Sequence, residues 1–143
     1  MNETHAQTMD RTYRLMKHVY DATRPLFLAG RPAIRQRIIE LSPGHVAEIG
    51  CGTGRNIILL ARKMSHTRFT GLDISRQMLN FAKAKARKAG IADKVQFILD
   101  DASSADIGIS VDLAFFSYSL SMIPDWKSAL HGAAEALAPG GTL

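Results

Sequence analysis

At positions 48–54 the chain reads Glu48-Ile49-Gly50-Cys51-Gly52-Thr53-Gly54, with a glycine at every second place after Glu48. The strand-like run His45–Ile49 leads into these glycines, and the helix-like segment Asn56–Met64 follows them. Glycines between a strand and a helix allow a sharp backbone turn and let a ligand approach the peptide groups. The segment therefore predicts a ligand-binding loop at the end of a buried strand.

Segments typical of strands and helices alternate through the rest of the chain. Further strands are predicted at Arg68–Leu72, Val95–Leu99 and Val111–Phe116. Helices are predicted at Pro32–Leu41, at Asn56–Met64, between Ser75 and Gly90, and at Asp125–Ala136. The hydroxyl of Ser75 is suited to cap the third of these helices. Repeated strand–helix–strand units predict a Rossmann-like α/β fold, a doubly wound parallel sheet with helices on both faces.

This pattern divides the chain into two regions. We expect a helical N-terminal cap over residues 1–44 and a ligand-binding domain over residues 45–143. The turn Pro139-Gly140-Gly141 leads into a fifth strand, of which only Thr142-Leu143 is present. The sheet is therefore expected to be truncated at the start of its fifth strand. Val111–Phe116 would then have a bare apolar edge, a feature that invites aggregation.

The composition is that of a globular chain, with 143 residues, of which 46% are hydrophobic and 22% charged. No apolar run approaches the roughly 20 residues that a membrane-spanning helix needs, and residues 1–10 lack the apolar core of a signal peptide. Cys51 is the single cysteine, so a disulfide within the chain is excluded and a reducing compartment is the simplest interpretation. We expect a cytoplasmic protein.

The net charge of +5 is unevenly distributed. Residues 55–94 contain ten basic and two acidic side chains, whereas residues 95–143 contain one basic and six acidic side chains. A basic half suits an anionic partner such as nucleic acid or lipid headgroups. A solvated lysine-rich helix is the simpler explanation of the same charges.

The spacing of the glycines favours a cationic ligand over a dinucleotide. The dinucleotide pattern requires its third glycine at position 55, which is Arg55. Glu48 would also repel a diphosphate, whereas it would attract a ligand with positive charge. S-adenosylmethionine carries an ammonium and a sulfonium, so the sequence predicts this cofactor. Cys51, inside the loop, is expected to be a small filler rather than a nucleophile.

Two further segments supply acceptors for a nucleoside. Asp73 ends the second strand, where its carboxylate is placed to accept both hydroxyls of a ribose, and Ile74 and Met78 follow it. Met78 would cover an adenine face, although packing in the core explains it equally well. Asp100 and Asp101 end the third strand, and one of them would accept the adenine amino group. We favour Asp101, together with Ala102.

The segment Ser117–Trp126 follows the fourth strand and is where a methyl acceptor would meet the cofactor. Ser117 is expected to contact the cofactor. Tyr118, Trp126, Tyr13 and Tyr20 could hold a methylated ammonium by cation–π attraction, although packing of the following helix is the simpler interpretation of Trp126. The candidate catalytic residues are Tyr20 and Tyr118. Tyr20 is also expected to contact the cofactor. The five histidines lack metal-ligand spacing, so we expect no metal.

Taken together, four segments resemble the successive motifs of the class I S-adenosylmethionine-dependent methyltransferases. These segments are Val46–Asn56, Phe69–Ser75, Val95–Ser103 and Val111–Trp126. The resemblance implies that Gly50, Gly52 and Gly54 wrap the methionine portion of the cofactor. It also implies that Asp73 holds the ribose and Asp101 the adenine.

A narrower resemblance rests on Tyr20–Arg24, Phe27–Arg31 and Ser117–Trp126. These stretches resemble the diacylglyceryl homoserine N-methyltransferases of betaine lipid synthesis, whose lipid amine receives three methyl groups in turn. The resemblance implies a lipid amine substrate whose headgroup carboxylate pairs with Arg24 or Arg31. It also gives the basic helix carrying Lys83 and Lys85 a role in peripheral contact with the anionic inner face of the membrane. With a lipid as partner, we expect no nucleic acid.

Several alternatives remain open at the level of sequence. Methylation of a small molecule, of phosphatidylethanolamine or of a quinone belongs to the same class of chemistry. A fragment that binds the cofactor without turnover is a third reading. A nicotinamide-dependent dehydrogenase is disfavoured by Arg55 and Glu48.

Overall fold

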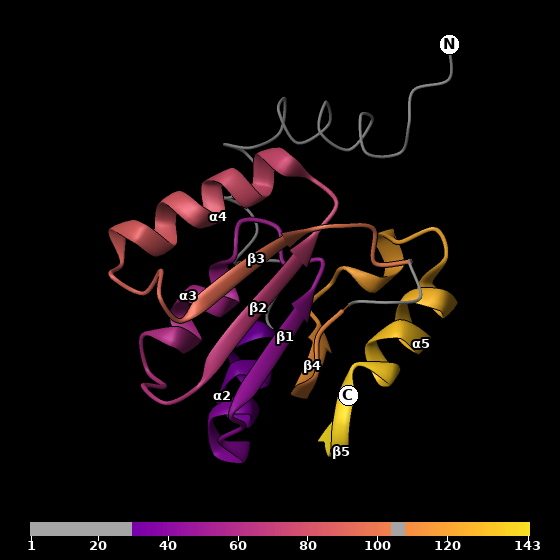
Figure 1. Ribbon diagram of the computed structural model, residues 1–143, viewed down its shortest axis with the longest axis horizontal. Helices are drawn as coiled ribbons and strands as arrows, with labels where there is room; N and C mark the ends of the chain where they lie inside the picture. The colour runs from indigo at the N-terminus through magenta and orange to yellow at the C-terminus, as the bar shows by residue number, and fades with distance from the viewer. Residues whose placement is uncertain (1–29, 104–107) are drawn as a thin grey trace.

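The computed structural model describes residues 30–103 and 108–143, which form a five-stranded sheet with helices against it (Figure 1). All the paired strands are parallel, in the order β3-β2-β1-β4-β5. The strands are β1 (His45–Ile49), β2 (Arg68–Asp73), β3 (Val95–Leu99), β4 (Val111–Phe116) and β5 (Leu137–Thr142). The helices are α2 (Arg31–Leu41), α3 (Arg55–Ala61), α4 (Arg76–Lys88), the 3-10 turn η1 (Leu120–Met122) and α5 (Trp126–Glu135). The predicted Rossmann-like α/β fold is confirmed.

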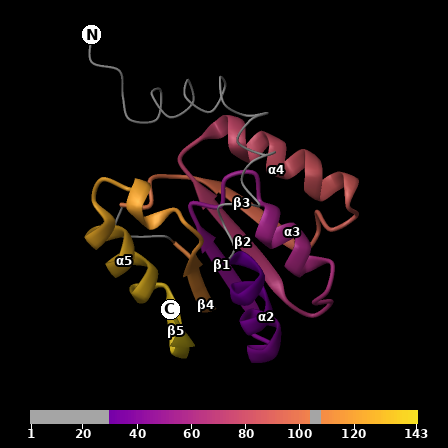
Figure 2. The same cartoon turned by 180° about the vertical axis from the view of Figure 1, so that it is seen from behind.

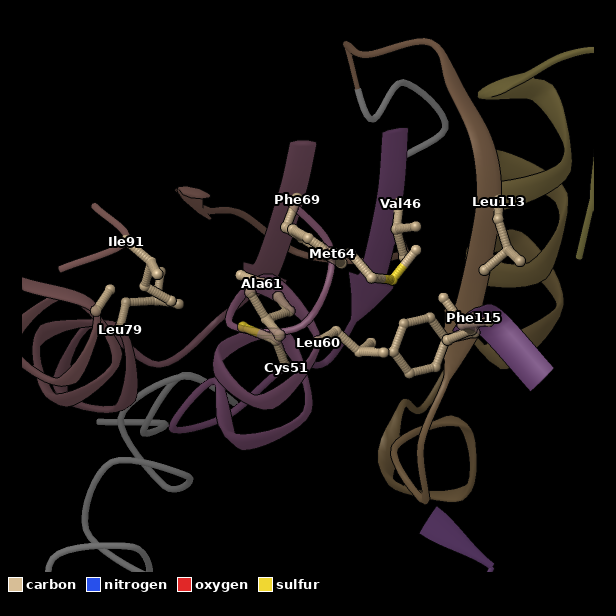
Figure 3. Close-up of a cluster of buried hydrophobic side chains, with 13 residues drawn as sticks. Val46, Cys51, Leu60, Ala61, Met64, Phe69, Leu79, Ile91, Leu113 and Phe115 are labelled. Carbon is tan, nitrogen blue, oxygen red and sulfur yellow. The ribbon is translucent and has the colours of Figure 1, made fainter. Parts of the chain in front are cut away.

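Two apolar clusters, one on each face of the sheet, make up the core. On one face, Val46 and Phe69 of the strands pack against Leu60 of α3 and Leu79 of α4, as Figure 3 shows. On the other face, strand residues such as Ile49 pack with Ala129 and Ala133 of α5. Figure 2 shows α5 separated from α3 and α4 by the sheet. Because neighbouring residues of a strand point to opposite faces, β1 contributes to both clusters.

The ends of the helices follow from local chemistry. Ser75 caps α4, as predicted, because its Oγ accepts a hydrogen bond from the Met78 backbone N–H at 3.3 Å. Gly90 follows this helix with a φ of +68°, a conformation that glycine adopts without strain. Pro32 lies in the first turn of α2, where its missing N–H costs nothing. Helix α3 is shorter than predicted, because its regular turns end at Ala61 rather than at Met64.

The fifth strand differs from the prediction. Strand β5 begins at Leu137, well before Thr142, and pairs with β4 at Val111–Leu137 and Leu113–Thr142. Between these two pairs the chain advances two residues along β4 but five along β5, so β5 contains extra residues that are not paired. The predicted turn at Pro139-Gly140-Gly141 lies in this irregular part of the strand. Proline is tolerated there because β5 lies at the edge of the sheet. Strand β4 lies between β1 and β5, and the expectation that it has a bare edge is wrong.

Within the two described ranges, no helix combines the length and the apolar character needed to cross a membrane.

Candidate functional site

A cavity lies at the carboxyl ends of the strands, which is where parallel α/β sheets bind their ligands. Each of the loops that follow β1, β2, β3 and β4 contributes to its wall. The lining residues are Gly50, Gly52, Leu72, Asp73, Ile74, Met78, Asp101, Ala102, Ser117, Tyr118, Ser119, Met122, Ile123 and Pro124. The structure thus brings together most of the residues that were predicted to bind the cofactor.

The glycine loop turns through three left-handed residues. Gly50, Gly52 and Gly54 have φ values of +71°, +55° and +69°. A Cβ on Gly50 would lie 2.4 Å from the Cβ of Ser119, so the close approach of the loop after β4 also requires glycine there. The Gly50 backbone N–H donates to the carbonyl oxygen of Leu72 at 2.8 Å, which ties the loop to the end of β2.

Gly54 allows close packing between helix α3 and its neighbours. It does not line the cavity, and a Cβ on it would lie 3.1 Å from the Cβ of Ala82 and 3.1 Å from Cε1 of Phe97. The absence of a side chain therefore lets the start of α3 approach α4 and β3. Two of the three glycines, Gly50 and Gly52, line the cavity.

Asp73 connects the end of β2 to the glycine loop. Its Oδ2 accepts a hydrogen bond from the Gly52 N–H at 2.7 Å, and its Oδ1 accepts one from the Ser75 N–H at 2.9 Å. The side chain is 9% exposed and lines the cavity. Two backbone donors thus orient the carboxylate, whose oxygens each have more than one lone pair with which to accept further hydrogen bonds.

The loop after β3 separates the two acidic candidates. Asp101 and Ala102 line the cavity, whereas Asp100 does not. The Oδ1 of Asp101 accepts hydrogen bonds from the Ser103 N–H at 2.9 Å and from the Ser103 hydroxyl at 2.7 Å, which orients the side chain. The Asp100 carboxylate instead accepts the Asp101 N–H at 2.8 Å and supports the turn.

Besides Gly54 and Asp100, two more described residues of the predicted cofactor site do not line the cavity. Glu48 lies under the glycine loop on the α3 side of the sheet, where its Oε1 accepts a hydrogen bond from Asn56 at 2.7 Å. Cys51 is buried in the apolar cluster that includes α3. Burial raises the pKa of the Cys51 thiol well above its usual range, and the Asp73 and Glu48 carboxylates act in the same direction. The thiol is therefore a packed filler, because it stays protonated at neutral pH.

The loop after β4 forms another part of the cavity wall. Ser119 is buried and its hydroxyl donates to the carbonyl oxygen of Ile49 at 2.6 Å, which joins the loops after β4 and β1. Tyr118 has a φ of +58°, a conformation that is strained for a residue with a side chain. Its hydroxyl accepts a hydrogen bond from the Gly30 N–H at 3.1 Å, and the Arg31 guanidinium lies 5.9 Å from its ring centroid. These contacts hold the phenol at the mouth of the cavity.

A second hollow adjoins the first and shares Tyr118 with it. Its lining is mainly apolar and aromatic: Phe116, Tyr118, Leu120, Ser121 and Trp126. Trp126 is 46% exposed, with Lys127 Nζ 5.6 Å from the centre of its ring system. The interpretation of Trp126 as a core residue is therefore wrong, because the start of α5 turns its indole toward the hollow.

The remaining predicted residues lie outside the cavity wall or outside the described part of the chain. Arg31, predicted to bind substrate, is buried at the start of α2 and does not line the cavity. Tyr13, Tyr20 and Arg24 fall outside the described residues.

Sequence reasoning missed several residues that complete the wall and its support. Ser119, Met122, Ile123 and Pro124 line the cavity, although only their segment as a whole was predicted to do so. The supporting role of Asn56 was not predicted. The signal for it was a polar residue in the first turn of an otherwise apolar helix that directly follows the glycine loop.

The charges of the cavity wall fit a cationic nucleoside. Among the described residues that line it, Asp73 and Asp101 are carboxylates, and none is a lysine, arginine or histidine. A diphosphate would meet two negative charges there and no cationic partner, whereas a sulfonium and an ammonium would be attracted.

Sequence comparison agrees with this chemistry. The family described as the methyltransferase domain matches residues 46–141, which includes β2, β3 and β4, all but one end residue of β1 and of β5, and the whole cavity wall. The chain belongs to the class I S-adenosylmethionine-dependent methyltransferases.

Individual relatives and solved structures place the chain within this methyltransferase family. It is 34% identical over 123 residues to methyltransferase GfsG of Streptomyces halstedii, a match that covers 83% of this chain and 44% of the relative. It is 34% identical over 109 residues to the trans-aconitate 2-methyltransferase of Streptomyces avermitilis, covering 75% of this chain and 40% of the relative. The matched part of this methyltransferase chain thus spans less than half the length of either relative.

Solved structures of methyltransferases share the fold. A Methanococcus maripaludis protein assigned to the S-adenosyl-L-methionine-dependent methyltransferases superposes with a TM-score of 0.77 at 27% identity, over 99% of this chain and 65% of that one. A methyltransferase from Geobacter sulfurreducens, solved in complex with S-adenosyl-L-homocysteine, superposes with a TM-score of 0.65 at 28% identity, over 78% of this chain and 44% of that one.

Proposed function

We propose that this chain binds S-adenosylmethionine in the cavity at the ends of β1–β4 and serves methyl transfer to the amine of a lipid headgroup. The observation that carries the cofactor assignment is the hydrogen bond from the Gly52 N–H to Asp73, which joins the glycine loop to a carboxylate in a cavity whose described lining residues include no cationic side chain. In this proposal the backbone of Gly50 and Gly52 faces the methionine portion. Asp73 accepts the ribose hydroxyls and Asp101 accepts the adenine amino group.

The chain's own contribution to methyl transfer is positioning. The bound cofactor supplies an electrophilic methyl group on a positively charged sulfur. The acceptor nitrogen must arrive unprotonated, with its lone pair directed at that methyl carbon, so geometry matters more than a strong base. Ser117 is suited to orient the acceptor, because the residue lines the cavity and its buried Oγ makes no hydrogen bond within the described residues. Tyr118 would place an aromatic face beside the amine as it gains charge.

Two observations support a lipid amine as the acceptor. The stretches Tyr20–Arg24, Phe27–Arg31 and Ser117–Trp126 resemble the diacylglyceryl homoserine N-methyltransferases. The apolar hollow beside the cavity shares Tyr118 with it and would take the part of a lipid next to its headgroup. The homoserine carboxylate would pair with Arg24 or Arg31. Arg31 is buried outside the cavity wall, but its guanidinium lies 5.9 Å from the ring of Tyr118, which lines the cavity. The Arg24→Ala and Arg31→Ala variants test this pairing by loss of lipid methylation.

A small carboxylic acid is the second candidate acceptor. It is favoured by the likeness to trans-aconitate 2-methyltransferases, whose name gives a tricarboxylic acid as the substrate of those relatives. Transfer to a carboxylate oxygen would need no loss of a proton. It would, however, have to overcome the repulsion between the acid and the two carboxylates of the cavity wall.

Calorimetry and a transfer assay test the proposal. The chain is titrated with S-adenosylmethionine, S-adenosylhomocysteine and NAD, and we expect binding of the first two only. Binding of NAD alone would overturn the cofactor assignment.

The transfer assay tests the acceptor. Labelled S-adenosylmethionine is incubated with the chain and either diacylglyceryl homoserine in vesicles or trans-aconitate. Label in the lipid supports the amine acceptor, and label only in trans-aconitate rejects it in favour of the second candidate.

A further inference from the structure

Three polar side chains meet beneath the glycine loop and away from the cavity. Glu48 stands two residues before Gly50, and Asn56 stands two residues after Gly54. Asn56 Nδ2 donates a hydrogen bond to Glu48 Oε1 at 2.7 Å, and both side chains are 2% exposed. The bond therefore joins the two ends of the loop at its base.

Helix α2 supports this bond from outside. Arg35 donates a hydrogen bond from its Nη1 to Asn56 Oδ1 at 2.9 Å, so both ends of the Asn56 amide are held. The guanidinium also balances the charge of a carboxylate that is buried almost completely. Burial lowers the pKa of Arg35, as does the neighbouring Arg55, whereas the Glu48 carboxylate opposes this shift. Arg35 nevertheless stays charged at neutral pH.

On the side of β2, the loop is held by hydrogen bonds from the Gly50 and Cys51 N–H groups to the carbonyl oxygen of Leu72, and from the Gly52 N–H to Asp73. The Asn56 bond adds support on the side of α3. The loop also has much conformational freedom to lose. It contains three glycines with positive φ, and glycine loses more conformational freedom on ordering than any other residue. Helix α3 begins at Gly54 without a side-chain cap hydrogen bond. A loop that orders only when its ligand arrives would lose that entropy from the binding free energy.

We infer that Glu48, Asn56 and Arg35 form a clamp that holds residues 50–54 in their binding shape before the cofactor arrives. The inference rests on the proposed cofactor site and assigns its positioning residues. The charge of Glu48 alone would favour the cationic methyl donor over its neutral product. The clamp instead raises the affinity for S-adenosylmethionine and S-adenosylhomocysteine equally, because it acts on the loop backbone.

A reversal of the hydrogen bond tests the clamp. In Asn56→Asp two carboxylates face each other, which should weaken binding strongly. In the double variant Glu48→Gln/Asn56→Asp, the glutamine donates to the new aspartate and Arg35 still has a carboxylate oxygen to bind, so affinity should return to within about threefold of the original. Asn56→Ala should weaken binding of S-adenosylmethionine and S-adenosylhomocysteine by the same factor, about tenfold.

Hydrogen exchange of the ligand-free chain gives an independent measurement. The amides of Gly52 and Gly54 should exchange faster in Asn56→Ala, with little change in the strands. Arg37→Ala is the control on helix α2, because Arg37 shares that helix with Arg35 but, among the described residues, its ion pair is an exposed one with Glu40 at 3.5 Å. It should leave the exchange of these amides unchanged. Unchanged exchange and affinity in Asn56→Ala, or a folded double variant that fails to recover, would overturn the clamp. If the unaltered chain binds neither ligand, the proposed function fails, and exchange alone decides the clamp.

Discussion

At the scale of single residues, Gly50 and Gly90 share a left-handed backbone but differ in their surroundings. Their φ values are +71° and +68°. A Cβ on Gly90 meets nothing within 4 Å, whereas one on Gly50 lies 2.4 Å from the Cβ of Ser119. A substitution at Gly90 therefore costs only the free energy of the left-handed conformation, whereas one at Gly50 adds the free energy of the steric clash.

We predict that Gly50→Ala lowers the free energy of unfolding by about 3 kcal/mol, because the clash adds to the strain of the conformation. It should also abolish measurable binding of S-adenosylmethionine. Gly90→Ala should cost only about 1 kcal/mol and leave the affinity unchanged. Urea unfolding and calorimetry check both variants. Equal losses in the two would show that the contact with Ser119 has no role.

Asp73 gives the second prediction at this scale. Asp73→Ala leaves the Gly52 and Ser75 N–H groups without their carboxylate and removes a cavity acceptor. We expect affinity for S-adenosylmethionine to fall by about 100-fold, as two charge-assisted hydrogen bonds would predict. Asp93→Ala removes the same charge from an exposed loop and should bind normally. Calorimetry compares the two, and an Asp73→Ala variant that bound as Asp93→Ala does would contradict the assignment.

Cys51 supplies a prediction about pH. Its folded-state pKa is raised by burial, so the folded chain holds the thiol proton more tightly than the unfolded chain does. The resulting stability is present below the unfolded pKa, near 8.5, and is lost as the pH rises above it. Urea unfolding between pH 7 and 10 should show this loss, and Cys51→Ala should not. A thiol reagent should react with the native chain only as it unfolds.

At the scale of elements, most strands could be predicted because their patterns are local. The bounds predicted for β1, β3 and β4 are those observed, and the Ser75 cap of α4 is confirmed. The exception is β5, whose Pro139 and two glycines read as a turn. Pairing with β4 on both sides of these residues, at Leu137 and at Thr142, places them inside the strand as an irregularity in which Gly140 keeps a φ of +81°. This is a tertiary effect that local propensity does not contain.

Helix α4 supports a prediction about membranes. Its buried face is apolar, and its outer face carries basic side chains that form no ion pair with a carboxylate in the described part of the chain. We predict binding to anionic vesicles but not to neutral ones, with roughly 1 kcal/mol from each basic residue near the surface. The residues to change together to alanine are Lys83, Lys85, Arg87 and Lys88.

Vesicle sedimentation measures this binding, which should fall at least tenfold in the α4 variant. The control removes four positive charges elsewhere on the exposed surface, at Arg37, Arg62, Lys63 and Arg68. If both variants lose binding equally, net charge explains the effect and α4 is not a membrane contact. Equal binding of the unaltered chain to neutral and anionic vesicles would exclude the interaction altogether.

At the scale of the whole molecule, the cavity joins four loops, so a ligand in it should stabilise the fold as a unit. S-adenosylmethionine at 100 times its dissociation constant should add about 2.7 kcal/mol to the free energy of unfolding. The thermal midpoint should therefore rise by several degrees, and NAD at the same concentration should leave it unchanged. A midpoint that S-adenosylmethionine does not raise would contradict binding at this site.

The amino-acid sequence alone was sufficient for the glycine loop, the alternation of strands and helices, and the carboxylates at the ends of β2 and β3, because each depends on neighbouring residues. The direction of each side chain depended on the folded sheet. Glu48 shares the face of Val46, since alternate residues of a strand point the same way, and it therefore contacts Asn56 and does not line the cavity. Gly54 packs against α4, and Trp126 turns toward the second hollow. These contacts join segments distant in sequence, so only the tertiary structure decided them.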